Sequence, residues 1–522
     1  MTLVEDGQLE EHVVDTVAVE ARPAVESGNR PASWTKRLTP RVWLVVTLVG
    51  ALAVRLVNLN AVGFNSDEAV YSGQAASLAG NPLFTTQFPV FRAHPLLLPV
   101  LMSPMFQSGT PDLRARVFEA FLGVATVFVV FLIGRELFGF TTGVLAALIL
   151  AVMPYHVGVT RQVLLDGPAV LCITLAFWMF ARFVRNRQIE WLLAAAAMTG
   201  LAILTKETSI IVAGAFVIFI IVSPEVRRPV LTSALFTGVV LVVSLTFPLV
   251  VSLAGRSSTG QNYLAWQLAR SSNHAALFYL TVVPASIGWL VVLAAGTALA
   301  YRVNWNWRVL LLVLWIVVPL VALEVYPLKG FQYLLPVAPA VALLAARGLM
   351  TWHLPERWQL KVGPVARPAV AAVVVASLLV GTWSTMFPSS SSSAALAGGG
   401  GIPGGREAGK WINAHVIPGS ELLTIGPSMA NILTYYGHRP AQGLSVSSNP
   451  LHRNPSYTPV YNPDLSIHRG QFSFLVWDAY SAYRSPSTAR HLQVLVARHH
   501  GRTIYTQRVH GKPVIVIYQV RP

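Results

Sequence analysis

The strongest constraint on this chain is a series of apolar runs, each close to the length that a membrane-crossing helix needs. A helix requires roughly 20 apolar residues to span a hydrocarbon core about 30 Å thick. Such runs recur from residue 42 to residue 386, with more polar connections between them. They predict a polytopic α-helical membrane protein with about eleven transmembrane helices. The predicted spans are 42–57, 117–133, 142–155, 169–183, 191–204, 209–222, 230–253, 277–299, 309–323, 331–346 and 368–386.

The charge distribution favours a membrane over a nucleic-acid partner. The chain is 54% hydrophobic and 11% charged, its mean hydropathy is +0.56, and its formal net charge is +16. Lys and Arg collect in the connections between apolar runs, not on a face interleaved with aromatic residues, so nucleic-acid binding is not expected. The single cysteine, Cys172, lies inside an apolar run and cannot form an intrachain disulfide.

Alternate connections differ in basic charge, and this difference predicts the orientation of the chain. The richer set includes Arg182, Arg185 and Arg187, and the positive-inside rule places it in the cytoplasm. The N-terminus is then cytoplasmic, and an odd number of spans places the C-terminus outside. We therefore expect a multi-pass protein of the plasma (inner) membrane.

The sequence divides into four predicted regions. Residues 1–40 are polar and acidic, as in a disordered cytoplasmic tail, and residues 41–387 hold the apolar runs. Residues 388–405 contain a serine tract and a glycine tract, which are typical of a flexible linker. Residues 406–522 predict a small extracytoplasmic α/β domain, because short apolar segments with strand and helix periods alternate there. Its predicted elements are helices 406–416 and 486–499 and strands 422–425, 472–476 and 513–520.

Two adjacent carboxylates, Asp67 and Glu68, stand in the first long connection, just ahead of a predicted helix. Such a pair can supply a general base or bind a cation. The alternative is structural: Ser66 or Asp67 caps the helix, and Glu68 favours its positive end. The dipeptide alone leaves both interpretations open.

Other ionisable residues are predicted to lie at the same membrane face. Asp166 follows Arg161 in one connection, Lys206 and Glu207 lie between the fifth and sixth runs, and Lys329 precedes the tenth run. The fifth and sixth runs can alternatively form one broken pair that turns at Lys206. Ionisable groups near a membrane are costly unless they are paired or functional. Their convergence on one cavity would suit the transfer of a group from an anionic lipid carrier.

These stretches resemble the GT-C class of membrane glycosyltransferases, in particular the protein O-mannosyltransferase and aminoarabinose transferase group. The resemblance covers roughly residues 40–350. It rests on Asp67-Glu68-Ala69-Val70-Tyr71, on His94-Pro95-Leu96, on Arg161 through Asp166, on Gly200 through Lys206, and on Lys329 through Pro336. The fold that it implies is a GT-C helical domain with a small C-terminal extracytoplasmic α/β domain.

The resemblance implies that a sugar moves from a polyprenyl-phosphate donor to a hydroxyl of a protein, lipid or cell-wall glycan acceptor. Asp67 would be the general base, and Asp166 a second catalytic carboxylate that orients the sugar or assists a cation. No cofactor is implied with certainty, and a divalent cation stays open. Members of the group usually carry Arg where this chain has Gln332, so the phosphate contact would pass to another cation. The substrate-binding residues implied by the resemblance are Glu68, Tyr71, His94, Arg161, Lys206, Arg270, Lys329 and Tyr333.

Two rival functions remain. A transporter or flippase of lipid-linked sugars would show internal repeats and charges near the bilayer midplane, whereas these charges gather at the ends of the runs. A ligase or polymerase that uses lipid-linked donors commonly has a large outer loop late in the chain, whereas the long connection here comes early. The sequence does not identify the sugar or the acceptor.

Overall fold

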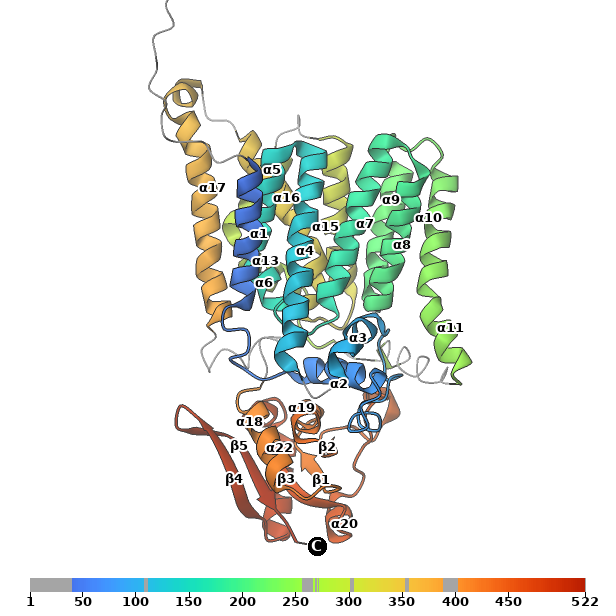
Figure 1. Cartoon of the computed structure of the whole chain (residues 1–522), viewed down its shortest axis with the longest axis vertical. Coiled ribbons are helices and arrows are strands. Elements are labelled where there is room, and N and C mark those ends of the chain that lie inside the picture. The colour runs from blue at the N-terminus through green and yellow to red at the C-terminus, as the bar shows by residue number, and fades with distance from the viewer. Residues whose placement is uncertain are drawn as a thin grey trace, which may run out of the picture. The chain divides into compact units, whose positions relative to one another are not determined.

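The computed structural model describes residues 40–107, 111–255, 266–267, 270, 272–300, 305–352, 356–387 and 402–521. The predicted N-terminal tail up to residue 39 and residues 388–401 of the predicted linker lie outside this description. Contacts join Pro40–Pro522 into one unit, in which helices form a bundle and a five-stranded sheet follows near the C-terminus (Figure 1).

The bundle is built from apolar helices, as the sequence predicts. Short pieces lie between them: α6 (Pro154–Val159) and the 3₁₀ turns η2 (Glu207–Ser209) and η4 (Phe331–Val337). The bundle helices are α1 (Pro40–Leu56), α4 (Asp112–Phe138), α5 (Phe140–Ala151), α7 (Asp166–Asn186), α8 (Ile189–Thr205), α9 (Ile210–Val222), α10 (Pro229–Ser244), α11 (Thr246–Leu253), α13 (Phe278–Ile287), α14 (Trp289–Ala300), α15 (Trp307–Val325), α16 (Ala338–Thr351) and α17 (Glu356–Met386).

The polytopic helical architecture is confirmed, but the number of eleven spans is not. Among the described residues, six helices are long and apolar enough to cross a membrane, or seven when one bent pair is counted as a single span. Several predicted spans correspond to shorter apolar helices, such as α5 and α9. The fifth and sixth runs form two separate helices, α8 and α9, joined by η2.

The predicted span 277–299 is wrong as a single straight helix. It consists of α13 and α14, whose axes bend by 102° at Gly288. Gly288 has φ +101°, a conformation that residues with a Cβ rarely adopt, and Pro284 lies in the last turn of α13. The apolar pattern does not reveal this bend because both halves are equally hydrophobic.

Side-chain packing in the bundle combines aromatic stacking with close approach at small residues. The rings of Phe177 in α7 and Trp315 in α15 stack with centroids 3.7 Å apart and an interplanar angle of 2°. Gly134 of α4 lies against Gly143 of α5, where a Cβ would come within 2.6 Å of the neighbouring backbone. Small residues allow helices to approach closely in lipid, where helices gain little from the hydrophobic effect.

Two short helices, α2 (Ser66–Leu78) and α3 (Leu97–Met102), lie at the end of the bundle that faces the C-terminal sheet (Figure 1). The turn η1 (Ser103–Phe106) follows α3 directly. We call this end of the bundle the domain end. The long connection between α1 and α4 therefore forms a layer between the bundle and the sheet.

The C-terminal α/β domain is confirmed, with a strand order of β2-β1-β3-β5-β4. β1 pairs in parallel with β2 and β3, whereas β5 is antiparallel to β3 and β4. The predicted helices and strands lie within two residues of α18, α22, β1, β3 and β5, while α19, β2, β4 and the three short helical elements η5, α20 and α21 were missed. The elements are α18 (Gly405–His415), β1 (Glu421–Thr424), α19 (Pro427–Gly437), β2 (Ala441–Gly443), η5 (Pro450–His452), α20 (Pro463–His468), β3 (Phe472–Asp478), α21 (Ala479–Arg484), α22 (Pro486–Arg498), β4 (Arg502–Val509) and β5 (Lys512–Gln519).

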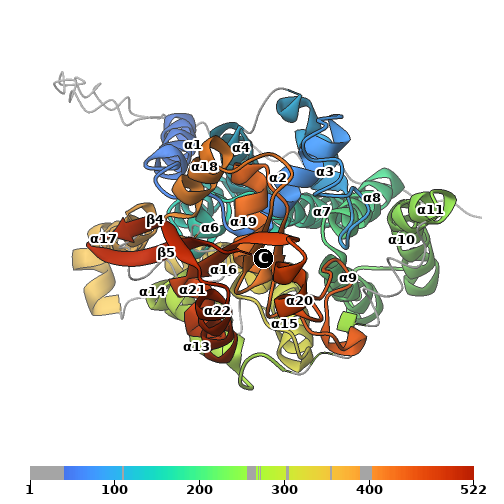
Figure 2. The same cartoon turned by 90° about the horizontal axis from the view of Figure 1, so that it is seen from below.

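Both faces of this sheet are covered, as the alternation of side chains along its strands requires. Leu422 and Val476 belong to the apolar core that continues through α18 and α19, while Leu423 and Leu475 pack with Leu492 of α22. Seen from below, α19 lies over α2 (Figure 2). The sheet domain therefore contacts the bundle through α19 and the α1–α4 connection.

Candidate active site

The helix α2 is capped by Asn65, so the structural alternative for the acidic pair is partly wrong. The Asn65 Oδ1 accepts hydrogen bonds from the backbone N–H groups of Asp67 and Glu68, both at 2.9 Å. The Glu68 Oε2 accepts from the Asn65 N–H at 3.0 Å and completes a capping box. Neither Ser66 nor Asp67 caps the helix, so the Asp67 carboxylate is not needed for this purpose.

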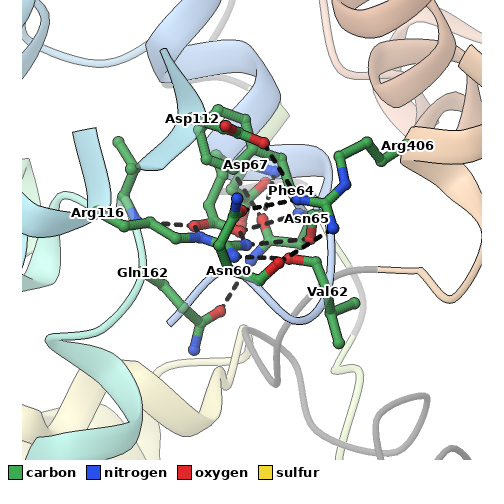
Figure 3. Close-up of polar contacts among 12 residues, drawn as sticks. Asn60, Val62, Phe64, Asn65, Asp67, Asp112, Arg116, Gln162 and Arg406 are labelled. Atoms are coloured by element: carbon green, nitrogen blue, oxygen red, sulfur yellow. Dashed lines mark hydrogen bonds and ion pairs between the residues drawn. The ribbon is translucent and has the colours of Figure 1, made fainter. Parts of the chain in front are cut away.

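Glu68 is fully buried and paired with Arg116 of α4. Figure 3 shows Arg116 among the polar contacts around Val62 and Asn65. The guanidinium donates to both carboxylate oxygens, at 2.8 and 2.7 Å. The Val163 N–H donates to Oε1 at 3.0 Å, and Arg116 also donates to the carbonyls of Val62 and Gly63. With both oxygens occupied and no exposed surface, Glu68 holds the turn before α2 in place and is poorly placed for the substrate contact predicted from the sequence.

Asp67, the adjacent carboxylate, has a different environment. Its side chain is exposed, and among the described residues it forms no salt bridge. The protein around it still desolvates the carboxylate, which raises its pKa above the usual value. The charges of Asp166 and Glu68 also raise this pKa, whereas His94 and Lys206 lower it. Asp67 is therefore an accessible carboxylate among four charged neighbours.

His94 and Glu207 form an ion pair next to Asp67. The His94 Nδ1 lies 3.0 Å from the Glu207 Oε1, and the Tyr71 ring meets the imidazole edge with centroids 6.1 Å apart. Burial alone would lower the pKa of His94, but the charge of Glu207 and the hydrogen bond to it raise the pKa overall. The imidazole therefore keeps its positive charge to a higher pH than an isolated histidine does.

Asp166 and Lys206 form a second ion pair in the same cluster. The Lys206 Nζ donates to the Asp166 Oδ1 at 2.6 Å and lies 4.1 Å from the centroid of the Tyr333 ring. Asp166 begins α7, Lys206 directly follows α8, and Tyr333 lies in η4. Three elements distant in sequence thus bring together three of the predicted site residues.

A narrow cavity of about 20 Å³ opens beside this second pair, which is enough for roughly one water molecule. Asp166, Lys206 and Tyr333 line its polar end. Ile211 of α9 and Leu323 of α15 line its apolar side. The cavity therefore leads from charged groups at the domain end to an apolar gap between two bundle helices.

Three predicted site residues are engaged elsewhere. Arg161 donates to the Val54 carbonyl of α1 at 2.7 Å, and Arg270 stacks over the Trp266 ring at 4.5 Å. The Lys329 Nζ is paired with the Glu324 Oε2 at 2.6 Å and is only 3% exposed. Several cations were predicted to hold the donor phosphate. Among the described residues, Lys206 is the one of these cations that forms an ion pair with Asp166, the second predicted catalytic carboxylate.

Sequence reasoning missed the parts played by Asn65 and Arg116. Asn65 precedes an acidic pair, and Asn with Glu three residues later is a capping-box signal that could have been found. Arg116 gave no comparable signal, because its partner Glu68 lies 48 residues away. The sequence left open whether a divalent cation takes part. The described part of the chain contains no group of three His, Cys, Asp or Glu residues that could hold a metal ion.

Known membrane proteins resemble this chain in part of its sequence and in its fold. The family model of dolichyl-phosphate-mannose-protein mannosyltransferases matches residues 93–251. The structure of ArnT from Cupriavidus metallidurans bound to undecaprenyl phosphate superposes with a TM-score of 0.66 at 16% identity, covering 91% of this chain and 98% of that one. The oligosaccharyltransferase AglB from Archaeoglobus fulgidus, in complex with an inhibitory peptide and a dolichol-phosphate, gives 0.60 at 13% identity, covering 94% and 75%.

Among curated sequences, the candidate mannosyltransferase YycA of Bacillus subtilis is 28% identical over 162 residues, which are 31% of this chain and 24% of YycA. The chain thus spans about a quarter of the length of that relative. The chain therefore has a fold of the GT-C class of membrane proteins, because it superposes with ArnT over nearly its whole length. Its residues 93–251 resemble the family of dolichyl-phosphate-mannose-protein mannosyltransferases.

Proposed function

We propose that this protein transfers a sugar from a polyprenyl-phosphate donor to an acceptor hydroxyl, with Asp67 as the general base. The proposal is based mainly on the Asp67 carboxylate, which is accessible and does not cap a helix. It lies near two cationic groups, His94 and Lys206. The solved relatives support the donor class, since ArnT was crystallised with undecaprenyl phosphate and AglB is found with a dolichol-phosphate.

The proposed chemistry is a single displacement. The acceptor hydroxyl attacks the anomeric carbon and gives its proton to the Asp67 carboxylate. The bond from the anomeric carbon to the phosphate oxygen breaks with its electron pair on that oxygen. The leaving phosphate therefore gains one negative charge, which Lys206 and protonated His94 stabilise. A single displacement inverts the configuration of the sugar.

The cavity between Lys206 and the α9–α15 gap supports a lipid-linked donor. Its charged end suits a phosphate, and its apolar side, formed by Ile211 and Leu323, suits an isoprenoid chain. At about 20 Å³ it is too small for either group, so α9 and α15 must separate when the donor binds.

The reaction is tested on lipid that copurifies with the protein from its host membrane. Mass spectrometry is expected to find a polyprenyl-phosphate sugar, and an added acceptor should gain the mass of that sugar as the donor is consumed. Asp67→Asn serves as the matched inactive control. Movement of intact lipid-linked sugar across a vesicle membrane, with no covalent change, would contradict transfer and identify a flippase.

The proposed location is the plasma membrane, with the N-terminus in the cytoplasm and the domain end outside. The basic residues support it, because Arg185 in the last turn of α7 and Arg187 directly after that helix lie at one end of the bundle, where they pair with Glu136 and Glu225. A reporter that is active only in the cytoplasm, fused after Pro522, is expected to be silent. A strong signal would show that the protein has the opposite orientation in the membrane.

Lys206→Gln is expected to weaken donor binding by about 10–100-fold, because a charge-assisted hydrogen bond to phosphate contributes about 1.5–3 kcal/mol. Lys206→Arg should restore part of the loss. The matched control is Lys329→Gln, which removes a cation that is also paired with a carboxylate, Glu324, but does not line the narrow cavity. That control should lower thermal stability and leave the donor Kd unchanged. Equal donor affinity in Lys206→Gln and wild type would remove Lys206 from the phosphate site.

A further inference from the structure

A second, larger cavity lies between the α1–α4 connection and the C-terminal domain. Its volume is about 320 Å³. Thr86 and Gln87 line it from the connection, Asn431 and Thr434 from α19, and Gln442 from β2. The cavity is separate from the Lys206 cavity, because the two share no lining residue.

The lining is polar and almost neutral. Apart from Arg92, its polar side chains carry hydroxyl or amide groups, and each of these offers both hydrogen-bond donors and acceptors. Arg92 is the one charged residue among the described lining residues, and its guanidinium is engaged. It lies 5.1 Å from the Tyr457 ring centroid and 5.8 Å from that of Phe88, and it donates to the Asn431 Oδ1 at 3.3 Å. A neutral, hydroxyl-rich ligand matches this set better than an ion does.

One lining side chain has an unused hydrogen-bonding atom. The Gln87 Oε1 is buried and has no hydrogen-bond partner among the described residues. A buried acceptor without a partner is costly, so rotation of the Gln87 side chain toward a ligand hydroxyl in the cavity would be favourable.

The cavity runs along the edge strand β2, from Pro440 just before the strand to Gly443 at its end, and it reaches Pro427 at the start of α19. It is also coupled to the candidate base: the Asn431 Nδ2 donates to the Ser66 Oγ at 2.9 Å, and Ser66 immediately precedes Asp67. A ligand in the cavity would therefore lie close to the turn that carries Asp67.

We infer that this cavity binds a neutral sugar unit of a glycan acceptor, adjacent to the unit whose hydroxyl is glycosylated. The inference rests on the proposed transfer reaction and adds the acceptor class to it. A peptide acceptor fits less well, because β2, the edge strand beside the cavity, has only three residues for main-chain pairing. The acceptor is then an oligosaccharide or polysaccharide, with one unit in the cavity and the next at Asp67.

The test measures binding of defined probes to the full chain in lipid nanodiscs. The probes are four neutral disaccharides, mannobiose, maltose, cellobiose and arabinobiose, together with the peptide Ala-Thr-Ala-Pro-Thr-Ala. Gln87→Leu removes the unpartnered acceptor atom, and Ala441→Phe fills the cavity from β2. The controls Gln493→Leu and Ala414→Phe make the same changes at exposed positions outside the cavity.

At least one disaccharide is expected to bind, and both cavity variants should weaken it by tenfold or more while the controls bind as wild type does. The acceptor KM should rise in parallel, with the rate of donor hydrolysis by water unchanged. Absence of disaccharide binding to the wild type, equal binding by the cavity variants, or binding of the peptide in place of the sugars would overturn the inference. Disaccharide binding that the cavity variants abolish, in a protein that transfers no sugar, would retain the site and refute only the transfer.

Discussion

Asp67→Asn is expected to lower sugar transfer by a factor on the order of 10²–10⁴, with donor binding and thermal stability close to wild type. The amide of Asn cannot accept the proton of the acceptor hydroxyl. The fold should be insensitive to the change, because the Asp67 side chain is exposed and Asn65 caps α2. Transfer is measured with purified donor and acceptor, and stability by thermal unfolding in detergent.

The pH dependence of transfer gives a second readout of the same residue. Desolvation raises the pKa of Asp67, so its basic form is lost on acidification at a higher pH than for an ordinary aspartate. The kcat/KM of the wild type should therefore rise with pH through this raised pKa. The pH profile of Asp67→Asn should lack this dependence of kcat/KM on pH in the acidic range. A variant with nearly wild-type transfer and an unchanged pH profile would show that the base lies elsewhere, with Asp166 the next candidate.

Arg116→Met is expected to destabilise the protein by about 3–5 kcal/mol, because it leaves a buried carboxylate without its partner. Glu68 is fully buried and Arg116 is 3% exposed, so solvent cannot replace the lost contact. The carbonyls of Leu59, Val62 and Gly63 also lose their donor. Thermal and denaturant unfolding of the purified protein measure the change.

The matched control for this variant is Arg185→Met. Arg185 pairs with Glu136 but is 57% exposed, so its loss should cost less than about 1 kcal/mol. In a double-mutant cycle, Glu68→Gln should recover part of the stability lost in Arg116→Met, since the unpaired charge disappears. Equal stability of the two Arg variants would contradict the role assigned to the buried pair.

The sequence predicted the features that depend on local pattern. Long apolar runs indicated the membrane helices, and the order of short motifs indicated the GT-C class, which the comparisons support. It also placed Asp166 and Lys206 at one membrane face, and the structure joins them at 2.6 Å. Alternating periods predicted an α/β domain, although β2, with three residues, is too short to leave a pattern.

What the sequence could not predict depends on partners distant in the chain. Lys206 and Lys329 are equivalent in sequence as cations beside apolar runs, and each pairs with a carboxylate at 2.6 Å, yet Lys206 lines the narrow cavity and Lys329 does not. Asp67 and Glu68 are adjacent and chemically alike, but only Glu68 faces Arg116. Such differences follow from which helix lies opposite each side chain.

The covalent connection between α17 and α18 affects how tightly the C-terminal domain must dock. The domain is held to the bundle by polar contacts such as Arg406 with Asn60 and Tyr436 with Asp112. Because it is tethered, its docking is an intramolecular equilibrium, with an effective concentration on the order of millimolar. Contacts too weak to join two separate proteins are then sufficient to keep the domain closed. If the acceptor is the glycan chain inferred above, such a domain could release and recapture it many times without separating from the bundle, which would favour repeated reaction along one glycan.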